Sequence, residues 1–145
     1  MKPFKHVLAI ITTLTLFSCS SDSTSPDTEK PTISIVKPTD EQSVLSGENL
    51  TIEIAFSDNV ELASYKIEIH YSGDGHSHNR LNSQNEDIPW NYHSEGNLSG
   101  KNDIIHSTVQ VPINAEHGMY HFGVYALDRA GNQNIQWVEL DVEHE

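Results

Sequence analysis

Apolar and polar residues alternate in short runs from Thr32 onward, and Pro, Gly, Asn and Asp residues separate the runs. A period of two predicts strands with one buried face, whereas an amphipathic helix repeats its apolar positions every three or four residues. Five alternating sets are expected to face a common core: Ile33 and Ile35; Leu50, Ile52, Ile54 and Phe56; Tyr65, Ile67, Ile69 and Tyr71; Ile105, Ser107, Val109 and Val111; and Tyr120, Phe122, Val124 and Ala126.

Two other segments complete the pattern. The last run covers residues 135–142, and its apolar phase changes between Trp137 and Val138, which predicts a β-bulge there. Residues 72–103 are mostly polar and too many for a plain connection, so they hold short strands, around Trp90 to His93, or form a functional excursion. About seven short strands around an alternating core favour an all-β sandwich, with a closed barrel as the alternative.

The N-terminus carries a targeting signal. Lys2 and Lys5 precede an apolar stretch, residues 7–17, that is too short for a permanent membrane span and is typical of a secretory signal peptide. The stretch ends in Leu16-Phe17-Ser18-Cys19, which resembles the lipobox of bacterial lipoproteins. The resemblance implies that Cys19 is acylated and becomes the new N-terminus. Because Ser20 follows it, we expect an anchor in the outer membrane rather than the inner one.

The mature chain is strongly acidic. We expect a signal peptide over residues 1–18, the acylated Cys and a flexible tether without apolar residues over 19–31, and one folded domain over 32–145. Without Lys2 and Lys5, six Lys and Arg remain against 21 Asp and Glu, a net charge of −15 with neutral His. Nucleic acids and anionic membrane surfaces are therefore unsuitable partners, and cations are suitable ones.

Several segments resemble bacterial immunoglobulin-like domains: residues 31–38, Phe56-Ser-Asp-Asn59 with Leu62, and Val124-Tyr-Ala-Leu-Asp-Arg-Ala-Gly-Asn132. With the lipobox, the histidines of the middle segment and Gly118-Met-Tyr-His-Phe122, the chain resembles a family of small, functionally uncharacterised lipoproteins of that fold. The resemblance implies an immunoglobulin-like β-sandwich with a long excursion between its third and fourth strands, called C and D in that fold. It also implies that the middle segment, which contains Gly75-His-Ser-His78, handles metal ions.

Eight histidines follow the signal peptide, and their placement suggests a metal site. In an immunoglobulin-like topology five of them fall at one pole, and His70 and His121 fall on the outer faces of adjacent strands. Imidazoles without thiolates suit zinc or copper(II). The expected ligands are His70, His76, His78 and His121, with Asp74 or His117 completing the set. The alternative is that these residues are solvated or partly packed polar side chains.

The opposite pole offers a weaker alternative for calcium. Asp58 and Asp128 lie in two turns that adjoin in this topology, and carboxylates are calcium ligands. Asp residues also hydrogen-bond to their own backbone in turns, which explains both positions without a metal.

Nothing in the sequence indicates an enzyme, because it contains no nucleophile elbow, His-Glu-x-x-His motif or phosphate-binding Gly loop. The first hypothesis is therefore a lipid-anchored protein that captures zinc or copper at the cell envelope and hands it to an importer. The second is a non-catalytic module that binds a protein or glycan through the long excursion. Its aromatic surface would come from Trp90 and Tyr92 and from Tyr125 and Trp137, although Trp137 is expected to pack against the sandwich.

Overall fold

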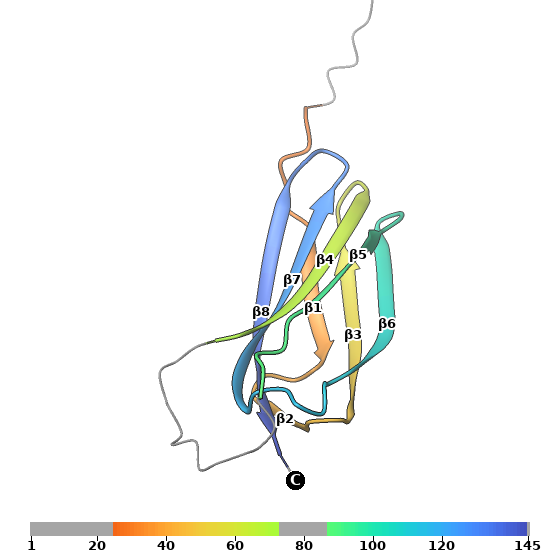
Figure 1. The fold of residues 1–145 in the computed structure, drawn as a ribbon. Helices are drawn as coiled ribbons and strands as arrows, with labels where there is room; N and C mark the ends of the chain where they lie inside the picture. Colours follow the sequence, from red (N-terminus) through yellow and green to blue (C-terminus); the bar gives the residue numbers. More distant parts are fainter. Residues whose placement is uncertain (1–24, 73–86, 145) are drawn as a thin grey trace, which may run out of the picture.

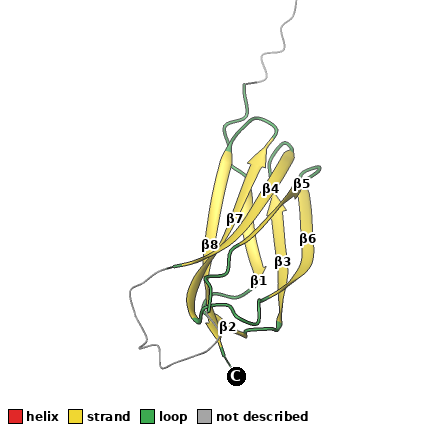
Figure 2. Ribbon diagram, in the orientation of Figure 1, coloured by secondary structure: helices red, strands yellow, loops and turns green. Residues whose placement is uncertain are grey.

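The computed structural model describes residues 25–72 and 87–144 (Figure 1). Their regular structure is entirely β, as Figure 2 shows, and this part of the chain has no helix that could cross a membrane. The strands are β1 (Thr32–Lys37), β2 (Gln42–Leu45), β3 (Asn49–Ser57), β4 (Leu62–Tyr71), β5 (Tyr92–Asn97), β6 (Asn102–Gln110), β7 (Gly118–Asp128) and β8 (Gln133–Glu143).

The strands form two sheets that face each other. One sheet has the order β1-β3-β6 and the other β2-β8-β7-β4-β5. All neighbours are antiparallel except β2, which runs parallel to β8. The prediction of an all-β immunoglobulin-like sandwich is confirmed, with eight strands where about seven were expected. The additional strand is β2, whose four residues include a single buried one, Val44, and so show no readable alternation.

The turns define two poles of the sandwich. The β3–β4 turn (residues 58–61), the β7–β8 turn (129–132) and the incoming residues 25–31 lie together at the top of Figure 1. We call this end the N-terminal pole. We call C-terminal pole the opposite end, with the end of β4, the β6–β7 connection (111–117) and the chain end after β8. The two poles are separated by the length of the strands.

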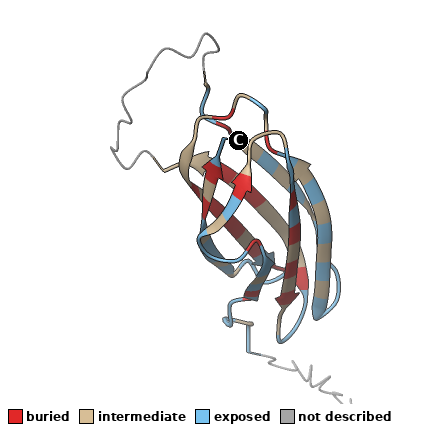
Figure 3. Ribbon diagram, turned by 90° about the horizontal axis from the view of Figure 1, so that it is seen from below, coloured by how far each residue is buried: buried red, intermediate tan, exposed pale blue. Residues whose placement is uncertain are grey.

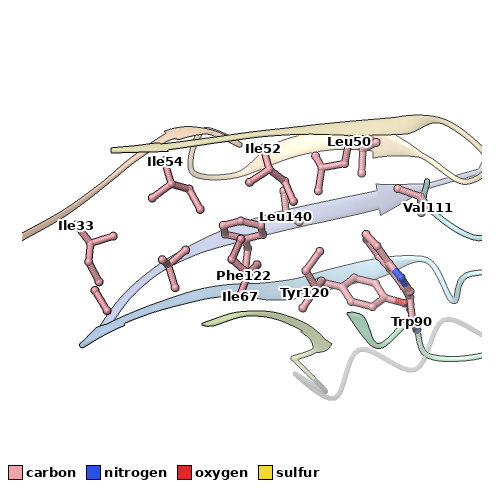
Figure 4. Packing of buried hydrophobic residues seen from close by; sticks show 14 of the residues in the cluster. Ile33, Leu50, Ile52, Ile54, Ile67, Trp90, Val111, Tyr120, Phe122 and Leu140 are labelled. Carbon is pink, nitrogen blue, oxygen red and sulfur yellow. Dashed lines mark hydrogen bonds between the residues drawn. The ribbon is translucent and has the colours of Figure 1, made fainter. Parts of the chain in front are cut away.

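The core fills the space between the sheets, as the alternating buried and exposed stripes of Figure 3 show. Leu50, Ile52 and Ile54 of β3 face Phe122 and Leu140 of the other sheet (Figure 4). The predicted core faces of β3 and β7 are confirmed, because these residues are almost fully buried. Every member of the buried cluster lies between Ile33 and Val142, so a chain that starts at Ser20 keeps the whole core.

The bulge predicted in the last run is wrong. Strand β8 pairs with β7 in one uninterrupted register from Gly118 opposite Val142 to Leu127 opposite Gln133. The phase changes because the apolar side chain of Trp137 lies on the outer face of its sheet, 40% exposed, whereas Val138 points inward and packs against the core. The alternation of inward and outward side chains along β8 is therefore unbroken, and Trp137 is an apolar residue at an outward position.

Trp90 does not provide an open platform, because only 6% of it is exposed. Figure 4 shows its ring beside that of Tyr120 within the core, and the ring centroids are 6.1 Å apart. The segment from Asp87 to Asn91 therefore lies over the C-terminal end of the core before β5 begins. The prediction of a short strand close to Trp90 is confirmed, since β5 starts at Tyr92.

Candidate metal centre

His70 and His121 lie side by side on the outer face of the larger sheet. They are directly opposite in the pairing of β4 with β7, and their ring centroids are 5.3 Å apart in an edge-to-face arrangement. Both point outward because their neighbours Ile69 and Phe122 fill the core. The predicted adjacency of the two imidazoles is confirmed. The other expected ligands His76 and His78, the possible ligand Asp74 and the expected acylation site Cys19 lie outside the described residues.

Trp137 covers the strand beside this histidine pair. Its cross-strand partner is Gly123, where a Cβ atom would lie 2.1 Å from Cζ3 of the indole, so the ring rests directly on the glycine backbone. The ring centroids of His70 and His121 are 5.7 and 6.1 Å from that of Trp137. Together with Asp40 and Glu139 these rings line a shallow hollow of about 490 Å³. The hollow thus combines two imidazoles and two carboxylates with one exposed indole.

A second group of metal-binding side chains lies at the C-terminal pole. Asp87, His117 and His144 each offer one ligand atom, and these three atoms all lie within 4.8 Å of one another. The imidazole centroids of His117 and His144 are 5.5 Å apart, and His144 Nε2 is 3.7 Å from Asp87 Oδ2. His117 therefore lies beside His144. Four residue steps of extended chain, roughly 13 Å, separate His117 from His121.

Main-chain hydrogen bonds bring Asp87 to His117. Ile88 forms an isolated parallel bridge with Ala115, in which Ile88 N donates to Asn114 O and Glu116 N donates to Ile88 O, both at 2.9 Å. Asp87 directly precedes Ile88, and His117 directly follows Glu116, so the bridge brings the two side chains to the same place. The buried Tyr120 reinforces it, because its hydroxyl donates to Glu116 O at 2.6 Å and accepts from Trp90 N at 3.2 Å. Burial raises the pKa of this hydroxyl, so it remains a donor at neutral pH.

His144 reaches the same place from the end of β8. The parallel pairing of β2 with β8 continues as a hydrogen bond from Ser46 N to Glu143 O at 2.9 Å. Ser46 Oγ lies 3.2 Å from His144 Nδ1, which leaves Nε2 on the side of Asp87. A hydrogen bond to one ring nitrogen is the usual way in which a protein orients a metal-binding imidazole. A hollow of about 430 Å³ beside His117 and His144 is also lined by Asp141 and Glu143.

Two imidazoles and a carboxylate match the three-residue sets that hold zinc while leaving a position for water. Sequence reasoning named His117 as a possible ligand but missed Asp87 and His144. Asp87 was one carboxylate among many in an acidic chain, and His144 followed the last predicted strand. The bridge between Ile88 and Ala115, which brings these residues together, has no period-two signature.

The N-terminal pole brings Asp58 and Asp128 together, as their turns predicted. Asp27, from the stretch expected to be tether, joins them, and the three carboxylates offer ligand atoms within 4.8 Å of one another. Asp128 is 2% exposed, and burial raises its pKa, but hydrogen bonds from the Asn132 side chain and from the backbone of Asn132, Gly131 and Ala130 together outweigh burial, so the net pKa is lowered. Asp27 was missed because it precedes the first strand.

A short hydrogen bond on the outer face of the larger sheet leads to a testable prediction. The Tyr125 hydroxyl donates to Glu68 Oε1 at 2.5 Å, and this bond raises the pKa of Tyr125 to about 12. The protonated phenol is favoured in the folded state, which contributes stability below about pH 10 that is lost as the pH rises through about 12. Glu68→Gln is expected to return this pKa toward its ordinary value, as ultraviolet titration of the tyrosines would measure. An unchanged titration curve would contradict the assignment.

Several solved structures are similar to this chain. The chain is similar to the fibronectin(III)-like modules of Clostridium thermocellum CbhA, with 12% identity and a TM-score of 0.44 over 77% of this chain and 94% of that one. It is also similar to the sporulation control protein Spo0M of Bacillus subtilis, with 10% identity and a TM-score of 0.47 over 80% and 49% of the two chains. A Niemann-Pick type C2 protein from Japanese carpenter ant has 8% identity and a TM-score of 0.45 over 79% and 90%.

These structural likenesses are too distant to say anything about activity. A comparison with curated proteins finds no significant match. A sequence family described as "Domain of unknown function (DUF4625)" matches residues 17–143, and the chain therefore belongs to this family.

Proposed function

We propose that this protein is a lipid-anchored, non-catalytic binding protein of the bacterial cell envelope that captures a divalent transition metal ion, zinc or copper(II). The observation that supports it best is the convergence of Asp87, His117 and His144 within 4.8 Å at the C-terminal pole. The anchor rests on the resemblance of residues 16–19 to a lipobox, with Cys19 as the acylated residue.

The donor set favours a transition metal over calcium or magnesium. Imidazole nitrogen suits zinc, copper and nickel, whereas hard cations prefer sites made of oxygen alone. The net charge of −15 after the signal peptide attracts cations toward the protein and raises their local concentration. Asp141 and Glu143 beside the site add carboxylates that would assist the approach of an ion.

The metal centre and the anchored end lie at opposite poles. Residues 25–31 enter at the N-terminal pole, and His144 follows the strand that ends at the C-terminal pole (Figure 1). An anchored protein would thus present its metal centre away from the membrane, where an importer or another envelope protein has access to it. His70 and His121 would form a second capture surface near the same pole, and the sequence adds His76 and His78, which lie outside the described residues.

Zinc titration by calorimetry tests this function on the metal-free chain that starts at Ser20. At pH 7.5 we expect one site with a dissociation constant in the micromolar range or below, as is suitable for two imidazoles and a carboxylate. At pH 5 protons compete for the imidazoles, so the affinity should fall by about 100-fold or more. Copper(II) should give the same dependence on pH.

Matched variants locate the site. His117→Gln and Asp87→Asn should each weaken zinc binding by about 10-fold or more, because each removes one ligand. His106→Gln is the control, since His106 is exposed on β6 of the other sheet and should leave the titration unchanged. Equal zinc binding by the parent and by His117→Gln and Asp87→Asn would contradict a metal centre at this pole.

A second candidate function is a protein- or glycan-binding module, and the exposed indole of Trp137 favours it. A tryptophan that rests on a glycine and shows its other face to solvent is suited to stacking against a sugar ring. Trp137→Ala should abolish glycan binding if this module is the function, and it should leave zinc binding at Asp87, His117 and His144 intact. Trp137→Ala and His117→Gln therefore distinguish the two candidate functions.

A further inference from the structure

The three carboxylates at the N-terminal pole come from three separate parts of the chain. Asp27 precedes β1, Asp58 follows β3 and Asp128 ends β7, yet their ligand atoms lie within 4.8 Å of one another. None of the ion pairs formed within residues 25–72 and 87–144 involves these three groups. Two basic side chains near this pole form other contacts, since Lys101 Nζ donates to Asn59 O and Arg129 Nε pairs with Glu61. The three negative charges thus repel one another, and no ion pair of the described residues offsets this repulsion.

Two oxygens in this cluster are inaccessible to solvent and accept no hydrogen bond: Asp27 Oδ2 and Asp58 Oδ1. Burial of a carboxylate oxygen without a partner is costly, because the oxygen loses its hydration and gains nothing in return. Turn chemistry accounts for the other oxygen of Asp58, which accepts from the backbone N–H groups of Val60 and Glu61 at 2.8 Å. It accounts neither for the two orphaned oxygens nor for the presence of a third carboxylate.

The remaining oxygens of the cluster are held in place by hydrogen bonds. Asn59 Nδ2 donates to Asp27 Oδ1 at 3.1 Å, and Asn132 donates to both oxygens of Asp128 at 2.7 Å. Donors that fix one side of a carboxylate while its other side faces a shared space are the usual outer shell of a metal site. The cluster offers oxygen alone, with no imidazole or thiolate, which is the preference of calcium rather than of zinc or copper.

We propose that Asp27, Asp58 and Asp128 form a calcium site that ties the tether to the N-terminal pole. The ion compensates the three charges and gives the orphaned oxygens of Asp27 and Asp58 a partner. Because Asp27 belongs to the incoming chain, calcium also fixes the direction in which the sandwich leaves its anchor. The same segment is already held by Asn132 Nδ2, which donates to Asp27 O at 3.2 Å, and by Asn134 Nδ2, which donates to Pro31 O at 2.9 Å.

Calcium titration of the chain that starts at Ser20, freed of metal with a chelator that is then removed, tests this site. We expect one calcium site with a dissociation constant of about 10⁻³ M or tighter, the range of extracellular modules. Asp27→Asn should weaken it by about 10-fold or more. This variant lies outside both sheets, so it should leave the fold intact, whereas Asp58→Asn and Asp128→Asn also alter a turn.

Asp103→Asn is the matched control, because Asp103 is the second residue of β6, accepts hydrogen bonds from Ser99 N and Ile104 N and lies outside the cluster. It should bind calcium like the parent. A second readout is proteolysis within residues 25–31, which calcium should slow in the parent and in Asp103→Asn but not in Asp27→Asn. Absence of calcium binding at about 10 mM, well above the affinity range of such modules, would overturn the proposal, as would equal binding by Asp27→Asn and Asp103→Asn. His117→Gln should keep its calcium affinity, so that failure of the zinc site and failure of the calcium site are separate results.

Discussion

Replacement of Phe122 by Ala is expected to lower the free energy of unfolding by about 3–5 kcal/mol. The Phe122 side chain has no exposed surface and lies between the two sheets, where its ring meets side chains of both (Figure 4). Truncation removes the transfer free energy of the ring and leaves a cavity that rigid paired strands fill poorly. Urea denaturation followed by tryptophan fluorescence measures the change.

Ile113→Ala is the control for this prediction. Ile113 is 77% exposed, so its truncation should change the free energy of unfolding by less than about 0.5 kcal/mol. Trp90 is a suitable reporter because it is buried beside Tyr120 in the same core. A loss below about 1.5 kcal/mol for Phe122→Ala would contradict the packing described above, because it would mean that the sheets close over the missing ring.

Replacement of Tyr120 by Phe is expected to cost about 2–4 kcal/mol in spite of the small change in volume. The substitution leaves two main-chain groups, Trp90 N–H and Glu116 C=O, without the hydroxyl that joins them. Each buried polar group left without a partner costs about 1–3 kcal/mol. The same hydroxyl holds the segment after Asp87 against the one before His117, so zinc affinity should also fall several-fold. Urea denaturation and zinc calorimetry on one preparation measure both effects.

The matched control is Tyr92→Phe. Tyr92 is half-buried at the start of β5, and its ring packs beside Trp90 at 6.4 Å, so the variant tests the loss of a hydroxyl from the neighbouring aromatic residue. It should change the free energy of unfolding by less than about 0.5 kcal/mol and leave zinc affinity as it is. If Tyr120→Phe unfolded at the urea concentration of the parent, the hydroxyl would not be what holds the bridge at the C-terminal pole.

The alternation of apolar and polar residues is sufficient to predict the fold class and the inner faces of the long strands. In β3 and β7 the core residues recur at every second position, because successive side chains of a strand point to opposite faces. The same parity predicted that His70 and His121 point outward, and the resemblance to an immunoglobulin-like fold placed them on adjacent strands. Asp58 and Asp128 were likewise brought together by the order of the turns. Local periodicity and a known topology were sufficient for these features.

Long-range packing sets which apolar residues lie on the outer face and which polar side chains meet, and the residue pattern does not predict either. Trp137 occupies an outer position because Gly123 on the next strand leaves room for its ring, and Trp90 is buried because its segment covers the end of the core. The proposed metal centre brings together Asp87, His117 and His144, and Asp27 joins the carboxylates of the other pole. Both arrangements depend on main-chain bridges and single side-chain hydrogen bonds between distant segments. Such contacts have no period along the chain, so they become visible only when the strands are in place.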